Sequence, residues 1–64
     1  SPATPRQMIE TLLDDELARD RAVSALARQG EAARDDLMTF ARIAPESLRP
    51  TFQDLLSRLN HGLD

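Results

Sequence analysis

The chain has 64 residues, a net charge of −3 and 30% charged residues, and it contains no cysteine. This length allows one small domain, and the lack of cysteine excludes disulfides and thiolate metal sites. No apolar run approaches the roughly 20 residues that span a bilayer, and no signal-peptide pattern occurs, so we expect a soluble, cytoplasmic protein. The acidic balance is poorly suited to a polyanion, because cationic side chains supply most of the non-specific affinity for nucleic acids.

The first helix start is the sequence TPRQ, residues 4–7. Thr is a favoured N-cap, Pro suits the first helical position, and Gln three residues after the Thr has the spacing of a capping box. We expect a helix over 5–14 that can fray independently of the rest. Residues 1–4 would be a linker or cloning remnant, and residues 5–64 a single helical domain. The apolar side of the helix contains Met8, Ile9, Leu12 and Leu13.

A helix over 17–29 is expected to lie at the centre of the fold. At about 100° per residue its small side chains fall on one stripe, which lets a neighbouring helix approach closely. Asp14 or Asp15 suits the N-cap, and Gly30 suits either a left-handed helix end or a hinge between two helices. The stripe contains Ala18, Ala22, Ala25, Leu26 and Gln29.

A third helix is expected over 31–43, where Pro45 ends it by pushing the preceding residue out of the helical region. Ser47 suits the N-cap of a fourth helix, with Pro50 inside the first turn and a stop at 60–62. The predicted fold is therefore all-α, a small bundle or hairpin stack of four short helices. Apolar stripes on the last two helices contain Ala33, Leu37, Phe40, Ala41 and Ala44, and then Leu48, Phe52, Leu55, Leu56, Leu59 and Leu63. The residues expected to be largely buried are Leu37, Phe40, Phe52, Leu55, Leu56 and Leu59.

Residues 18–30, ARDRAVSALARQG, resemble the inner part of a HEAT-type α-solenoid repeat. In that repeat an Arg follows a small apolar residue, Ala and Ala-Leu follow at fixed steps, and a Gly ends the first helix. Residues 12–15, LLDD, look like the end of a preceding repeat, and residues 46–56, ESLRPTFQDLL, resemble a second helix with the early proline common in that family. The resemblance covers about one and a half repeats, whereas solenoids usually need three or more. It implies a scaffold that binds proteins through one face.

The sequence offers little for catalysis. The single histidine, His61, has no second histidine or cysteine with which to share a metal ion, and we interpret it as a solvated residue at a helix end. Asp35 and Asp36 diverge by about 100° on a helix, so they cannot share a proton, and the pair at 14–15 is better explained as a helix cap. No phosphate-binding glycine loop, EF-hand loop or nucleophile elbow occurs. We predict that the protein is not an enzyme and has no catalytic residues, cofactor or metal.

A helix-turn-helix DNA-binding unit is the alternative function. The helix over 17–29, the joint at Gly30 and the helix over 31–43 have the required order, since the turn of that motif often contains glycine. The recognition helix would meet base edges with its N-terminal part, which here reads EAARDD, residues 31–36. Phosphates would repel its three acids. We therefore expect no nucleic-acid partner.

The favoured function is a non-catalytic docking or scaffold domain, part of a larger bacterial-type polypeptide. Three apolar side chains project away from the main stripes or lie at their edges, and they could form a second apolar patch for a protein partner or a second copy in a homodimer. No membrane or small-molecule substrate is expected. The partner-binding residues would be Val23, Met38 and Ile43, with Arg19, Arg34 and Arg42 setting the orientation. Should this patch not function, the remaining candidate is the polar face that carries Arg21, Ser24 and Arg28.

Overall fold

The computed structural model describes residues 3–60, which form four α-helices and two short 3-10 helices. The α-helices are α1 (Pro5–Asp14), α2 (Arg19–Gln29), α3 (Glu31–Ala41) and α4 (Arg49–Asn60). A 3-10 turn over Glu16–Ala18 (η1) leads into α2, and a second one over Glu46–Leu48 (η2) leads into α4. The fold is all-α, as the sequence predicts. None of the helices within 3–60 is long and apolar enough to cross a membrane.

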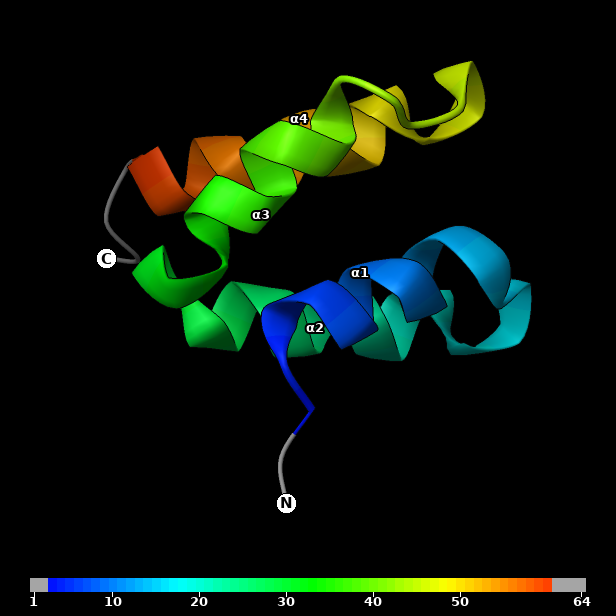
Figure 1. The fold of residues 1–64 in the computed structure, drawn as a ribbon, viewed down its shortest axis with the longest axis horizontal. Coiled ribbons are helices and arrows are strands. Elements are labelled where there is room, and N and C mark those ends of the chain that lie inside the picture. The colour runs from blue at the N-terminus through cyan, green and yellow to red at the C-terminus, as the bar shows by residue number, and fades with distance from the viewer. Residues whose placement is uncertain (1–2, 61–64) are drawn as a thin grey trace.

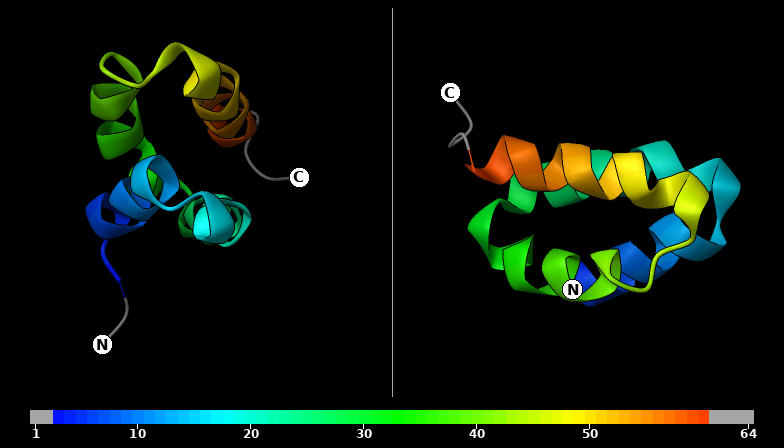
Figure 2. Two further views of the ribbon diagram at one scale, coloured as in Figure 1. Left: turned by 90° about the vertical axis from the view of Figure 1, so that its right-hand side faces the viewer. Right: turned by 90° about the horizontal axis from the view of Figure 1, so that it is seen from above.

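The helices form two antiparallel hairpins that are stacked on each other (Figures 1 and 2). Helix α1 packs on α2 and α3 packs on α4, while contacts from α1 to α3 and from α2 to α4 join the two hairpins. Seen end-on in the left view of Figure 2, the four helices lie at the corners of a rough square. The connection at Gly30 therefore runs from one hairpin to the other, and each hairpin keeps an outer face.

Side-chain caps fix the start of α1 and the start of the 3-10 turn that leads into α2. The Thr4 hydroxyl accepts a hydrogen bond from the Gln7 N–H (3.2 Å), and the Gln7 side-chain oxygen accepts one from the Thr4 N–H (2.8 Å). The Asp15 carboxylate accepts hydrogen bonds from the N–H groups of Leu17 (3.1 Å) and Ala18 (3.3 Å). The predicted capping box is confirmed, and Asp15 is the cap before the second helix.

The core lies between the hairpins and receives side chains from every α-helix. Helix α1 contributes Ile9 and Leu12, both with no exposed surface. The independent fraying expected for this helix does not fit such burial, because unfolding α1 would open the core. The full set of buried apolar residues is Ile9, Leu12, Ala22, Leu26, Ala33, Leu37, Ala44, Leu48, Phe52, Leu55 and Leu59.

Two residues expected to be largely buried are only half-buried. Phe40 and Leu56 pack against the core from its edge. The Arg6 guanidinium lies 5.8 Å from the centroid of the Phe40 ring, so an arginine of α1 covers the outer side of this aromatic residue. Burial is confirmed for the other four members of that set, and Leu63 lies outside the described residues.

Several helix boundaries differ from the sequence prediction. Helix α2 starts at Arg19 because the Asp15 cap draws the first three residues into a tight 3-10 turn. Helix α3 ends at Ala41, two residues before the predicted end. Ser47 is not an N-cap: it lies inside η2, which follows Pro45 and has no side-chain cap. Helix α4 then begins at Arg49, and the predicted stop at 60–62 extends beyond the described residues.

Removal of the Thr4 cap should destabilise helices other than α1 as well. We expect Thr4→Ala to lower the free energy of unfolding by about 1 kcal/mol in urea denaturation, because it leaves the Gln7 N–H without its acceptor. Since α1 carries core residues, amide exchange should accelerate in α2 and α3 as well. Thr39→Ala is the matched control, because Thr39 is an exposed mid-helix threonine and alanine is the better helix former there. Faster exchange confined to residues 5–14 would contradict this view of α1.

Candidate functional site

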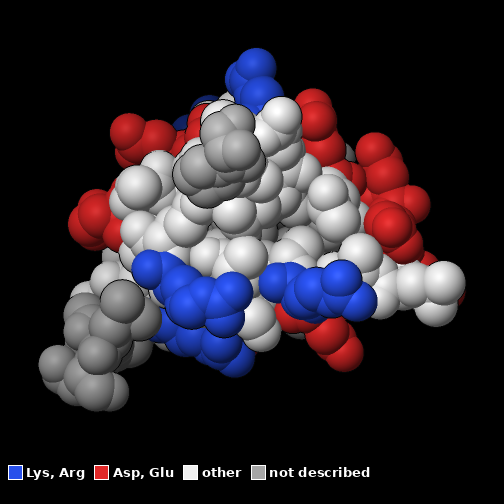
Figure 3. Space-filling model, turned by 90° about the horizontal axis from the view of Figure 1, so that it is seen from below, with Lys and Arg blue, Asp and Glu red and all other residues white. Residues whose placement is uncertain are grey.

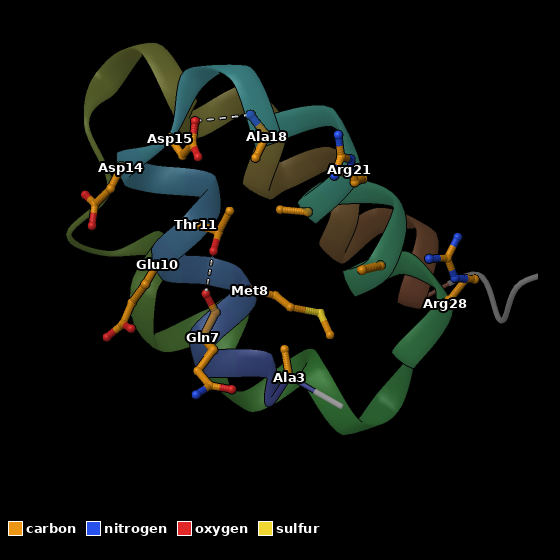
Figure 4. Close-up of a pocket in the computed structure, with 12 residues that line it drawn as sticks. Ala3, Gln7, Met8, Glu10, Thr11, Asp14, Asp15, Ala18, Arg21 and Arg28 are labelled. Carbon is orange, nitrogen blue, oxygen red and sulfur yellow. Dashed lines mark hydrogen bonds between the residues drawn. The ribbon is translucent and has the colours of Figure 1, made fainter. Parts of the chain in front are cut away.

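A groove of about 870 Å³ lies between α1 and α2 on the surface of the described chain. It lies on the outer face of the first hairpin, the side that faces away from α3 and α4 (Figure 4). Its apolar lining comes from both helices, and most of these side chains are small. They are Ala3 just before α1, Met8 in α1, Ala18 at the entry to α2, and Ala22 and Ala25 in α2.

Two side-chain hydrogen bonds hold the walls of the groove together at its opposite ends. At the closed end of the hairpin, Arg19 Nε donates to the backbone oxygen of Leu12 (2.8 Å). At the open end, Gln29 Nε2 donates to the backbone oxygen of Ala3 (3.3 Å). These bonds join α1 to α2 in the antiparallel hairpin and place Arg19 near Leu12 and Gln29 near Ala3.

The rims of the groove carry opposite charges. Glu10 and Asp14 are exposed along α1, while Arg21 and Arg28 are exposed along α2. In Figure 4 the two acids project from α1 on the side away from α2, and the two arginines project from α2. Figure 3 shows the same face: two groups of arginines lie along one edge of a pale central surface, and most of the acids lie toward the opposite edge, although one arginine stands among those acids and one acid lies beside the arginines. Within residues 3–60, none of these four charges forms an ion pair.

Other polar groups of the groove already have backbone partners. The Thr11 hydroxyl donates to the backbone oxygen of Gln7 (3.1 Å), and the Asp15 carboxylate caps the turn that leads into α2. Glu10, Asp14, Arg21 and Arg28 are therefore the groups that a bound molecule would meet at the rims.

The structure places the predicted partner-binding residues elsewhere. Val23 is half-buried and packs against the core, whereas Met38 and Ile43 are 45% and 73% exposed. Arg19 is occupied by its bond to the backbone of α1, and Arg34 lies 3.5 Å from Glu31. None of these residues lines the α1–α2 groove.

Arg42 lines a smaller hollow of about 380 Å³ beside α4, together with Arg49 and Phe52. This hollow shares no lining residue with the α1–α2 groove. No observation joins it with Met38 and Ile43 in one surface, so the predicted patch stays a prediction.

The second candidate surface from the sequence is closer to the groove. Arg21 and Arg28 stand on its rim, and Ser24, which belongs to the same polar face, is exposed. The acidic rim on α1 was missed, although the acids at 10 and 14 share one helix face at a spacing of four residues. Leu17, which is 96% exposed at the turn between the two helices, was also missed as a surface residue.

Comparison of the chain with models of known protein families, with curated proteins and with solved structures gave no match. Within residues 3–60, no group of three or more His, Cys, Asp or Glu side chains is placed to hold a metal ion.

Proposed function

We propose that the protein is a non-catalytic helical interaction domain that binds protein partners through the α1–α2 groove. The observation that carries the proposal is the combination of a shallow apolar floor with one acidic and one basic rim. An amphipathic helix laid along such a groove would bury its apolar stripe on the floor, and its flanking charges would set its direction. Cytoplasmic location and bacterial origin, which the composition suggests, belong to the same proposal.

Small side chains on η1 and α2 support a helical occupant in particular. Ala18 and Ala25 are half-buried and line the groove beside the buried Ala22. Because alanine projects little beyond the helix surface, the backbone of a docking helix could approach α2 closely. The partner would supply the larger side chains.

The HEAT-type resemblance is a further proposal about origin. Stacked helical hairpins support it, because α-solenoids are built by stacking helix pairs. The position of Gly30 is a departure, since this glycine connects the two hairpins instead of lying within one of them.

The helix-turn-helix alternative receives less support. Arg34, the arginine in the first two turns of α3, lies 3.5 Å from Glu31 of the same turn. The exposed Glu31 and Asp35 would face the phosphates together with it. A protein partner remains the favoured occupant.

The proposal can be tested with a phage-displayed library of helical peptides selected against the folded chain. We expect selected peptides to carry an apolar stripe with basic residues on one flank and acids on the other. Ala25→Glu should weaken binding of these peptides at least about tenfold, because it places a carboxylate on the apolar floor. Since Ala25 is only half-buried, the helical signal should persist.

The matched control for this test is Ala32→Glu, a change at an exposed alanine of α3 that does not line the groove. It should leave peptide binding unchanged. The proposal is wrong if no helical peptide can be selected, or if selected peptides bind Ala25→Glu as well as they bind the unchanged chain.

A further inference from the structure

The charge pattern of the α1–α2 groove is complementary to itself. Acids line the α1 rim and arginines line the α2 rim, so two copies placed face to face could neutralise each other's rims. We propose that a second copy of the chain covers this groove, in a dimer whose twofold axis runs parallel to α1 and α2. This inference rests on the proposed function and names the partner of the same site.

The direction of the axis follows from the rims. A twofold axis in the interface and parallel to the helices places α1 of each copy over α2 of the other, so acids face arginines on both sides. A twofold axis across the helices would place α1 over α1 and α2 over α2. That arrangement would bring like charges together at both rims, which opposes association.

The heights of Glu10 and Arg21 along the hairpin also agree with this axis. The bond from Arg19 Nε to the oxygen of Leu12 shows that these two residues lie about level. The two helices run in opposite directions, so moving two residues back from Leu12 on α1 matches moving two residues forward from Arg19 on α2. Glu10 is therefore about level with Arg21. Rotation about an axis parallel to the helices leaves heights unchanged. Glu10 therefore meets the partner's Arg21, and the symmetric pair forms on the other side.

Side-chain size selects the same arrangement. Continuing the same register by two more residues places Met8 level with the part of α2 between Ala22 and Ala25. The proposed axis would thus set the long, adaptable Met8 of each copy over the small residues of the partner's α2. An axis across the helices would oppose α1 to α1 and leave the alanines of α2 facing alanines.

Charge reversal provides a test that does not depend on any unknown ligand. Glu10→Arg makes both rims basic at this height, and Arg21→Glu makes both acidic. Each variant alone should dimerise at least about tenfold more weakly than the unchanged chain in sedimentation velocity at low salt. A mixture of the two variants should recover dimers, because each arginine then meets a glutamate of the other copy.

Two controls distinguish weaker dimerisation through the rims from loss of folding and from charge effects elsewhere on the surface. Both rim residues are exposed, so circular dichroism should show the same helical content in each variant. Glu46→Arg reverses an exposed charge on η2, outside the hairpin, and should leave the dimer unchanged.

Three results would overturn the dimer: a chain that stays monomeric up to about 1 mM, single reversals without effect, or a mixture that does not recover association. If helical peptides still bind in the groove of a monomeric chain, the proposed function stands and the second copy is the wrong occupant. If the charge-reversed variants recover dimers on mixing while no helical peptide can be selected, the dimer stands and the wider binding role does not.

Discussion

Leu55→Ala is expected to lower the free energy of unfolding by about 2–5 kcal/mol, the usual cost of truncating a fully buried leucine. Leu55 lies in α4 with no exposed surface, where it packs in the core between the hairpins. A domain of this size buries only about 60% of its unfolded surface, so its total stability is small. The variant should therefore be largely unfolded near room temperature, as measured by circular dichroism.

The neighbouring residue provides the matched comparison. Leu56→Ala removes the same atoms from a half-buried side chain, so we expect a loss of about 1–2 kcal/mol. Urea denaturation of the two variants side by side would measure the difference. Equal losses would mean that α4 is rotated about its axis by a fraction of the 100° that separates adjacent residues, with both leucines facing the core.

The different burial of Leu55 and Leu56 could not be predicted from the sequence. The stripe of leucines on α4 predicts a helix and a buried side, because its period is a local property of the chain. Which side chains at the edges of this stripe become buried depends on the other helices that pack against α4. Arg6 of α1 reaches across to Phe40 of α3, and such a contact between distant residues leaves no trace in the period of either helix.

Local features were predicted more completely. The Thr4 capping box and the Asp15 cap involve residues within four positions of each other, so their partners can be recognised from spacing. Ser47 shows the limit of that reasoning. It has the right residue type for a cap, but the chain leaving Pro45 forms a 3-10 turn first, and α4 begins two residues later.

The α1–α2 groove could not be predicted without the tertiary structure. The stripe of alanines on the helix over 17–29 predicts a site of close helix contact, and Ala22 of this stripe is buried in the core. All three alanines of this stripe line the surface groove, although Ala22 is buried while Ala18 and Ala25 are half-buried. A small residue suits either a core or a docking surface. Only the packing of α1 against α2 decides which of these two environments each alanine has. The opposed rims also become visible only once these helices are paired.

Gly30→Ala is expected to lower the free energy of unfolding by about 1–3 kcal/mol through the backbone alone. Gly30 has φ 59° and ψ −130°, a conformation that residues with a Cβ strongly disfavour. Its N–H donates to the oxygen of Leu26 (3.3 Å) and its oxygen accepts from the N–H of Ala33 (3.0 Å), so the chain cannot relax without losing bonds at both helix ends. The residue is also buried, so an added methyl group meets neighbouring atoms.

A D-amino acid at this position separates the two causes. A D-residue favours positive φ as an L-residue favours negative φ, and a chain of 64 residues is accessible to chemical synthesis. Gly30→D-Ala should therefore avoid most of the backbone cost and keep only the steric cost of the methyl group. Thermal denaturation of both variants should show Gly30→Ala to be clearly the less stable. Equal destabilisation would assign the loss to packing, and a Gly30→Ala chain within about 0.5 kcal/mol of the unchanged one would contradict the positive φ that carries the chain from the first hairpin to the second.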